Sequence, residues 1–136
     1  MTIEAERLNS LTDRIIHAAI EVHKTLGPGL LESAYRVCTA HELLLDHLQV
    51  AQEVPLPVVY KGVRLEAGYR LDMVVDDLVI VEFKSVEMLT PIHEAQVISY
   101  LKLSSLKVGL LINFNVKILK YGLRRIVNNF PPEEKP

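Results

Sequence analysis

One stretch of the chain, residues 69–86 (YRLDMVVDDLVIVEFKSV), constrains the fold more than any other. Its alternating pattern and β-branched residues are typical of two strands, and the paired aspartates in its middle predict the turn between them. Asp72, Glu82 and Lys84 interrupt this otherwise apolar hairpin. Because side chains on a strand alternate between its two faces, Glu82 and Lys84 are expected on the same side of the sheet.

The length of the turn determines the register of this hairpin. A two-residue turn would place apolar side chains opposite charged ones, for example Leu71 opposite Glu82. A three-residue connection, Asp76 to Leu78, makes one face fully apolar by pairing Leu71 with Phe83, Met73 with Val81, and Val75 with Val79. Because a slip of one residue exchanges the faces, the hydrophobic pattern selects this second register. Asp72 then lies beside Glu82, and Arg70 lies beside Lys84.

The selected register predicts two acids and a lysine on one surface of the sheet. Carboxylates a few ångström apart repel each other, and a shared proton, a nearby cation or a bound metal relieves the repulsion. Hard oxygen ligands of this kind suit Mg²⁺ or Mn²⁺, and Lys84 would then orient or deprotonate an attacking water. The alternative is a salt-bridged polar edge in which Lys84 neutralises Asp72 and Glu82. Residue types alone support the metal site and the salt-bridged edge about equally.

Length and composition predict one globular domain, since 136 residues that are 49% hydrophobic suffice for a full core. We place this domain at residues 1–130 and expect residues 131–136 to be a frayed tail. The single cysteine, Cys38, cannot form an intramolecular disulfide, and its apolar helical surroundings favour a buried, inert thiol. Without a signal-peptide pattern or a membrane-spanning run, we expect a cytoplasmic protein with no membrane partner.

The net charge of −2 hides an asymmetry along the chain. Up to Glu94 there are 8 basic and 15 acidic residues, whereas residues 95–132 hold 6 basic residues and no acid. A mild basic patch follows if those side chains gather on one surface, although solvated lysines and arginines are the default interpretation. The net negative charge disfavours strong, indiscriminate binding to nucleic acids, because such binding depends on many basic residues that release counterions from phosphates.

Two helices are predicted before the hairpin. The first runs to about Leu26, and its apolar stripe consists of Leu8, Leu11, Ile15, Ala19 and Val22. His23 borders this stripe, where a packed, hydrogen-bonded histidine is favoured over a metal ligand. After a break at residues 27–29, the second helix is expected from about Leu30 to His47. Its predicted buried face consists of Leu30, Ala34, Val37, Leu44 and Leu48.

Glu32 and Tyr35 lie three residues apart on another face of the second helix. Glu32 is either an ordinary partner of Arg36 or, if the start of the helix points at the acids, part of the same site. Gln96 and Tyr100 lie four apart on one face of a later helix, which begins with Thr90 as its cap and ends at about Leu103.

The remaining segments complete the predicted sheet. Residues 50–60 contain two prolines and are expected to form an extended edge, followed by a turn at Lys61 and Gly62. The run KVGLLINF predicts a buried strand, and residues 117–127 predict a weaker one. The order is therefore helix, helix, a run of strands, helix and strand. This is an α+β or mixed α/β fold whose central sheet is covered by helices.

Three motifs resemble known nucleases. Asp72, followed by EFK at residues 82–84, resembles the PD-(D/E)XK nuclease superfamily, whose core is a helix, three strands, a helix and a strand. Residues 29–35 (GLLESAY) match the GxxExxY signature that names one of its families. Gln96 and Tyr100 are similar to the Q-x-x-x-Y helix motif of the RecB-like exonuclease branch. The resemblance implies a restriction-endonuclease-like core with the order α-α-β-β-β-α-β.

This resemblance, which spans residues 10 to 128, also implies roles for individual residues. Asp72 and Glu82 would bind Mg²⁺ or Mn²⁺ with help from the backbone carbonyl of Phe83. Lys84 would position the hydrolytic water. Leu71 stands where many members have a proline before the first acid.

The resemblance implies further roles outside the hairpin. Glu32 would be the helix acid near the metal, and Tyr35 would support the site as the last residue of its signature. Gln96 and Tyr100 would orient the site or hold a phosphate. Some RecB-like relatives use an upstream histidine as an extra metal ligand, for which His23 is the candidate.

The leading functional hypothesis is a metal-dependent nuclease that hydrolyses phosphodiester bonds of DNA or RNA, with DNA preferred. One alternative is a non-catalytic module that keeps the fold and binds nucleic acid or protein. Another is a static ion-pair network formed by the acids and Lys84. A homodimer would supply a longer binding surface.

Overall fold

The computed structural model describes residues 2–66 and 68–132, so residues 133–136 of the predicted frayed tail lie outside the described residues. In chain order the elements are α1 (Ile3–Leu26), α2 (Glu32–Leu45), β1 (Val50–Pro55), β2 (Val58–Tyr60), β3 (Val63–Leu65), β4 (Arg70–Val75), β5 (Val79–Lys84), α3 (Pro91–Ser104), β6 (Val108–Asn113), the short 3-10 helix η1 (Leu119–Gly122) and β7 (Leu123–Val127). Among the described residues no helix is both long and apolar enough to cross a membrane.

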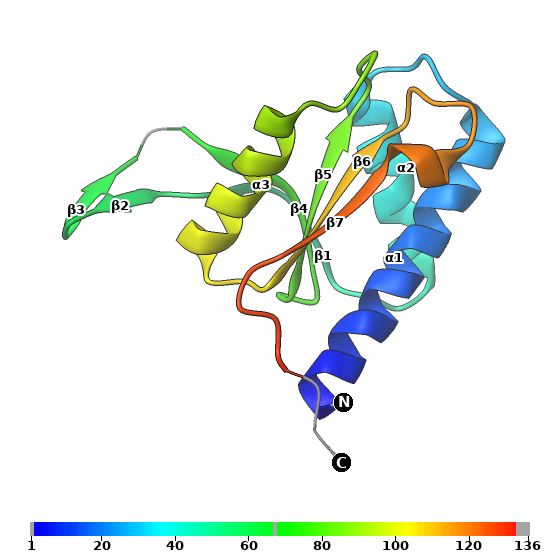
Figure 1. Ribbon diagram of the computed structural model, residues 1–136. Helices are drawn as coiled ribbons and strands as arrows, with labels where there is room; N and C mark the ends of the chain where they lie inside the picture. Colours follow the sequence, from blue (N-terminus) through cyan, green and yellow to red (C-terminus); the bar gives the residue numbers. More distant parts are fainter. Residues whose placement is uncertain (1, 67, 133–136) are drawn as a thin grey trace.

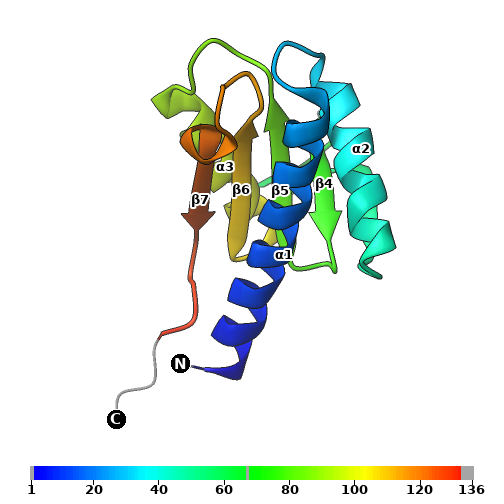
Figure 2. The same cartoon turned by 90° about the vertical axis from the view of Figure 1, so that its right-hand side faces the viewer.

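A five-stranded mixed sheet forms the centre of the protein, with the strand order β1-β4-β5-β6-β7. Strands β5 and β6 run parallel, and the other neighbours are antiparallel. Helices α1 and α2 cover one face of the sheet, and α3 covers the other (Figures 1 and 2). This confirms the predicted α+β architecture, which is consistent with a restriction-endonuclease-like fold.

Helix α1 agrees with its predicted pattern. The Thr2 side chain accepts a hydrogen bond from the Ala5 N–H at 3.0 Å and caps the helix. All five residues of the predicted apolar stripe are buried against the sheet and α2.

The buried face of α2 differs from the prediction. Its buried residues are Tyr35, Thr39, Ala40 and Leu43. Val37 and Leu44, which were expected inside, are 53% and 55% exposed, and Leu30 is exposed before the helix begins. The physical reason is the Tyr35 ring, which stacks on Phe114 with the ring centroids 4.4 Å apart and so turns its own face of the helix inward.

The β4–β5 hairpin has the predicted register as far as its ladder extends. Met73 pairs with Val81 and Val75 pairs with Val79, which confirms the three-residue connection. The predicted pairs of Leu71 with Phe83 and of Arg70 with Lys84 are not part of the ladder, because it ends at Met73. Leu71 instead packs in the apolar cluster under α3, whereas Phe83 packs in the cluster under α1 and α2.

The second half of the chain is close to its prediction. Helix α3 begins with Thr90 as its cap, and the His93 ring accepts a hydrogen bond from the Thr90 N–H at 3.0 Å. Strand β6 is buried along its whole length. Residues 117–127, predicted as one strand, instead form η1 followed by β7. Gly122 explains the interruption, since its backbone lies so close to the Asn113 carbonyl that an added Cβ would be 2.1 Å from that oxygen.

Strands β2 and β3 form a separate two-stranded sheet that projects from the body of the protein (Figure 1). We call residues 58–65, which make up this hairpin, the arm. The arm extends the β1–β4 edge beyond the core, and Lys61 and Gly62 form its turn, as predicted, with φ angles of 47° and 80°.

Candidate active site

The two acids of the hairpin meet where β4 and β5 separate. The Asp72 N–H donates to Glu82 Oε2 at 2.9 Å, and Asp72 Oδ2 accepts from the Phe83 N–H at 2.8 Å. Each carboxylate therefore receives a backbone hydrogen bond from the other strand. These bonds replace backbone pairing beyond the last ladder pair and fix both side chains in the fork between the strands.

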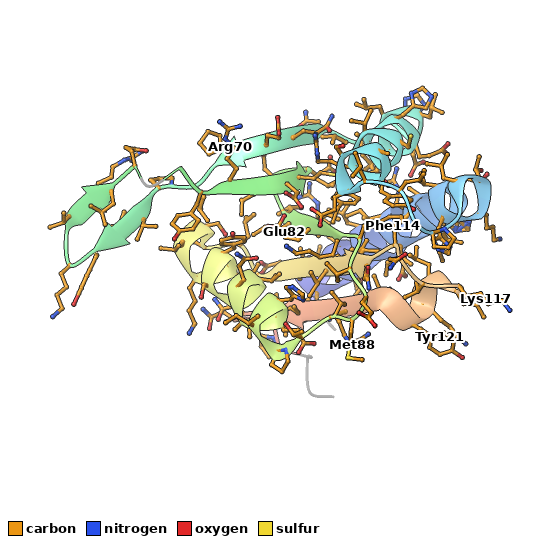
Figure 3. All side chains as sticks on the ribbon, turned by 90° about the horizontal axis from the view of Figure 1, so that it is seen from above. Arg70, Glu82, Met88, Phe114, Lys117 and Tyr121 are labelled. Atoms are coloured by element: carbon orange, nitrogen blue, oxygen red, sulfur yellow. The ribbon has the colours of Figure 1, made fainter. Side chains whose placement is uncertain are left out.

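Glu82 is the more deeply buried of the two acids, with 5% of its surface exposed (Figure 3). Burial, followed by the negative charge of Asp72 and a hydrogen bond between the two side chains, raises the pKa of Glu82 from 4.5 to about 9. The Lys84 ammonium acts in the opposite direction, as the weakest contribution. Two negative charges are thus unfavourable in this fork unless a cation accompanies them.

Lys84 is half-buried at the end of β5. Within the described parts of the chain, no ion pair of 4.0 Å or less involves Lys84, Asp72 or Glu82. The static ion-pair network that the sequence also allowed is therefore not formed there. The lysine carries its charge beside the acids without neutralising them by direct contact.

Glu32 is the first residue of α2 and is exposed. It lines a shallow pocket with Leu30 and Ser85, and the Ser85 hydroxyl donates to the Leu30 carbonyl at 2.7 Å. Ser85 follows Lys84 directly, so the start of α2 lies beside the end of β5. Among the described residues, however, no three His, Cys, Asp or Glu side chains gather closely enough to bind a metal, and Glu32 does not join the acid pair.

The alternative partner of Glu32, Arg36, also lies elsewhere. Its guanidinium donates to the Gln52 side chain and lies 3.9 Å from the Glu53 carboxylate. Both contacts are with β1, so Arg36 connects α2 to the edge of the sheet.

Tyr35 is fully buried and organises the loop between α1 and α2. Its hydroxyl donates to the Gly27 carbonyl at 2.6 Å and accepts from the Leu30 N–H at 3.0 Å. Tyr35, the last residue of the GxxExxY signature, therefore holds the loop that precedes Glu32. Its hydroxyl bonds to this loop and not to Asp72 or Glu82.

Gln96, which is exposed, and Tyr100, which is buried, line one pocket of about 380 Å³ with Val58, Tyr69, Ile92 and Leu103. We call it the α3 pocket. Burial raises the pKa of Tyr100, and the negative charges of Glu82 and Asp72 raise it further, whereas a hydrogen bond with Gln96 lowers it. The Tyr100 hydroxyl is thus close enough to experience the field of the acid pair.

His23 has a structural partner. It is 7% exposed, its Nε2 lies 2.7 Å from the Val116 carbonyl oxygen, and its ring packs at an angle against Phe114. This is the packed, hydrogen-bonded arrangement that the sequence favoured over metal ligation.

Asn113 is a buried residue near the site that the sequence reasoning missed. It pairs with Lys84 across the parallel β5–β6 ladder. Its side-chain amide donates to the Val86 carbonyl at 2.9 Å and accepts from the Val86 N–H at 3.0 Å. The signal in the sequence is a lone amide at the end of a fully apolar strand, where an unpaired polar group would be costly.

The basic residues of the second half are spread over several contacts. Lys107 binds Glu4 at 2.6 Å, Arg124 lies 3.7 Å from Glu94, and the Arg125 guanidinium lies over the Phe130 ring. Four of the six basic residues considered from the sequence, counting Lys120 over the Tyr121 ring, therefore have separate partners.

A mixed five-stranded sheet between helices, with two acids where two antiparallel strands diverge, is consistent with a restriction-endonuclease-like fold. Comparison with protein families matches residues 9–126 to the PD-(D/E)XK nuclease superfamily. The chain belongs to this superfamily, which implies a nucleic-acid substrate. No curated protein and no solved structure matches the chain.

Proposed function

We propose that this protein is a metal-dependent nuclease that hydrolyses phosphodiester bonds of DNA or RNA, with DNA as the preferred substrate. The observation that carries the proposal is the fork between β4 and β5, where Asp72 and Glu82 converge while Lys84 stays free of ion pairs in the described chain. The family membership supports the same chemistry.

The donor set of the fork fits a hard divalent cation. Each acid uses one oxygen for a backbone hydrogen bond, and the second carboxylate oxygens, with the Phe83 carbonyl, are the ligand type that Mg²⁺ and Mn²⁺ prefer. The raised pKa of Glu82 also fits, because a cation would take the place of the proton that the acid otherwise retains. When bound, such an ion activates water and withdraws charge from the phosphate.

The residues of the chain then have distinct tasks. Asp72, Glu82 and the Phe83 carbonyl would hold the ion in the fork. Lys84 would orient the attacking water and offset the negative charge that develops on the phosphate. Gln96 and Tyr100 would hold a neighbouring phosphate or orient the site. Glu32, at the start of α2, would be the helix acid near the metal.

A cleavage assay with matched variants tests the proposal. Purified protein is incubated with labelled single-stranded and double-stranded DNA and RNA, with Mg²⁺, Mn²⁺ or EDTA. Because Asp72→Asn and Glu82→Gln keep an oxygen for the backbone bonds, they should preserve the fold and lower Mn²⁺-dependent cleavage at least ~100-fold. Lys84→Met should lower it by about 10²- to 10⁴-fold.

Two control variants match these changes. Asp77→Asn makes the same change at the turn of the same hairpin, and Lys102→Met removes an exposed lysine of α3; both should cleave at the wild-type rate. Absence of cleavage on every substrate, or active-site variants as fast as the controls, would overturn the proposal. Nucleic-acid binding without cleavage and without Mn²⁺ binding in calorimetry would instead establish the non-catalytic module.

A further inference from the structure

The arm presents an apolar face that nothing in the described chain covers. Val58 pairs with Leu65 and Tyr60 pairs with Val63, so these four side chains share one face of the two-stranded sheet. Tyr60 is 52% exposed, and Val63 and Leu65 are exposed to a similar degree. A two-stranded hairpin with such a face gains little stability alone, so a bound molecule is the expected reason for it.

This apolar face leads into the α3 pocket, because Val58 belongs to both. Tyr69, which follows the arm, forms the near wall of the pocket, and Ile92 of α3 is exposed at the pocket as well. Tyr100, which experiences the field of the acid pair, lines the same pocket. An apolar, aromatic path therefore runs from the tip of the arm toward the fork.

The charge of this region is opposite to that of the whole chain. Residues 58–70 contain three basic residues, Lys61, Arg64 and Arg70, and one acid, Glu66, which Arg64 holds at 2.6 Å. The Lys61 ammonium lies over the Tyr60 ring at 5.4 Å. Arg70 begins β4 (Figure 3), and because the neighbouring Leu71 packs under α3, the Arg70 side chain lies on the opposite face of the sheet. A cation on an aromatic ring complements a chain that is anionic along its backbone and flat and apolar at its bases.

The same features disfavour the other occupants. A duplex keeps its bases stacked and paired, so it offers phosphates to the cations but nothing flat to an apolar face or a pocket. A second copy that met this one through the same face would bring the two sets of arm cations together, and like charges repel. An unpaired strand satisfies both the charge and the apolar surface.

We propose that the arm and the α3 pocket bind single-stranded nucleic acid, with one unpaired base in the pocket against Tyr69. This inference rests on the proposed function. At about 380 Å³ the α3 pocket lies at the lower end of the range for small-ligand pockets and has room for one base. Gln96 supplies hydrogen bonds to the edge of that base, and Tyr60 stacks on a further base. Lys61 contacts the phosphate between them, so that the adjacent phosphodiester reaches the fork.

Fluorescence anisotropy in EDTA tests this inference without cleavage. The probes are a labelled 20-nucleotide single strand and the duplex of the same sequence, at several salt concentrations. Tyr60→Ala and Tyr69→Ala should each weaken single-strand binding by about 5- to 100-fold, as loss of one base stack does, with little change for the duplex. Tyr69→Phe should bind as wild type, because stacking does not need the hydroxyl. Lys61→Ala should reduce the salt dependence by about one unit of slope, whereas Arg70→Ala, on the opposite face of the sheet, should leave it unchanged.

Tyr121→Ala is the matched control. Tyr121 is 65% exposed on η1, and the Lys120 ammonium lies over its ring at 5.1 Å, so the pair reproduces Tyr60 and Lys61 away from the arm. Its loss should leave single-strand affinity within twofold of wild type. Thermal melting of each variant checks that the exposed substitutions leave the core folded.

The outcomes separate this inference from the proposed function. Wild-type cleavage together with unchanged single-strand binding by Tyr60→Ala and Tyr69→Ala would overturn the inference alone. The same holds if the arm variants turn a dimer into a monomer in ultracentrifugation without affecting the single strand, since the arm would then bind a second copy. Arm variants that lose single-strand binding in a protein that cleaves nothing would support the inference and overturn the nuclease proposal.

Discussion

Asp72 and Glu82 are hydrogen-bonded through the backbone of Asp72, whose N–H donates to Glu82 Oε2 at 2.9 Å. In a regular antiparallel ladder that N–H would bond to a backbone carbonyl of the neighbouring strand. The carboxylate has taken the place of the carbonyl, so the acids end the ladder and line the opening that results. The fork and its charges are therefore one feature of the sheet, and changes to the acids should alter stability as well as activity.

The first prediction concerns pH. Because the pKa of Glu82 rises from 4.5 in the unfolded chain to about 9 in the fold, the folded state binds more protons between these values. The free energy of unfolding without metal should therefore be highest near pH 4.5 and fall as the pH rises toward 9. Glu82→Gln removes this dependence and should stabilise the protein at pH 7.5 by a few kcal/mol, roughly 2–4.

Urea denaturation in EDTA at pH 5, 7 and 9 measures this effect. Asp77→Asn, at the turn of the same hairpin, should retain the wild-type pH dependence. Equal slopes for wild type and Glu82→Gln would show that Glu82 ionises normally in the fold and that the fork tolerates both charges.

The second prediction concerns metal binding. A divalent cation competes with the proton on Glu82, so Mn²⁺ should raise the melting temperature much more at pH 8.5 than at pH 5.5. At 100 times its dissociation constant the ion should add about 2.7 kcal/mol to the free energy of unfolding. Asp72→Asn should abolish the response, whereas Asp77→Asn should keep it. If Mn²⁺ raised the melting temperature of both variants equally and independently of pH, the ion would bind outside the fork.

Features with strong local determinants could be predicted from the sequence. The alternation in residues 69–86 fixed the register of Met73 with Val81, because a slip of one residue would have exposed an entire apolar face. Thr90 followed by proline marked the start of α3. The favoured structural role for His23 also agrees with the structure.

Features that depend on contacts distant in sequence could not be predicted. The inward face of α2 is determined by the stacking of Tyr35 on Phe114, a residue 79 positions later, whereas periodicity alone predicted that Val37 and Leu44 would be buried. The end of the ladder at Asp72 depends on side-chain oxygens that replace backbone carbonyls, which a pattern of apolar residues does not encode. The placement of Glu32 outside the acid pair likewise follows from the loop that Tyr35 holds.

The third prediction tests that loop. Tyr35→Phe removes a buried hydroxyl that bonds to both Gly27 and Leu30, and leaves the Leu30 N–H and the Gly27 carbonyl, which are partly accessible, without this partner. The free energy of unfolding should fall by about 1–3 kcal/mol. The exposed Tyr121→Phe should change it by less than about 0.5 kcal/mol in the same urea titration. Equal stability of the two variants would mean that water replaces the hydroxyl and that the loop is held by other contacts.

The fourth prediction separates structure from metal ligation at His23. Because its Nε2 is committed to the Val116 carbonyl, His23→Ala should lower the free energy of unfolding by about 1–3 kcal/mol. Mn²⁺ affinity in calorimetry should stay within twofold of wild type. His17→Ala, an exposed histidine on the same helix, serves as the control and should leave both quantities unchanged. A large loss of Mn²⁺ affinity in His23→Ala alone would reassign it to the metal site.

The fifth prediction concerns Asn113, whose amide fixes Val86 just beyond Lys84. Asn113→Asp removes the donor to the Val86 carbonyl and buries a carboxylate in its place. At pH 7 this should cost about 3 kcal/mol of unfolding free energy or more, because the second oxygen of a buried carboxylate would face the Val86 carbonyl oxygen with no donor between them. Burial should raise the pKa of the new carboxyl, so the loss should shrink as the pH is lowered and the group becomes protonated.

Asn129→Asp is the matched control for this change, since Asn129 is exposed beyond the end of β7 and away from Val86. Its stability should differ from wild type by less than about 0.5 kcal/mol. If the Val86 segment positions Lys84, Asn113→Asp should also slow Mn²⁺-dependent cleavage under conditions where the protein remains folded, while Asn129→Asp should not. Full activity of folded Asn113→Asp would show that β5 alone positions the lysine, because the strand is already paired with β6 up to residue 84.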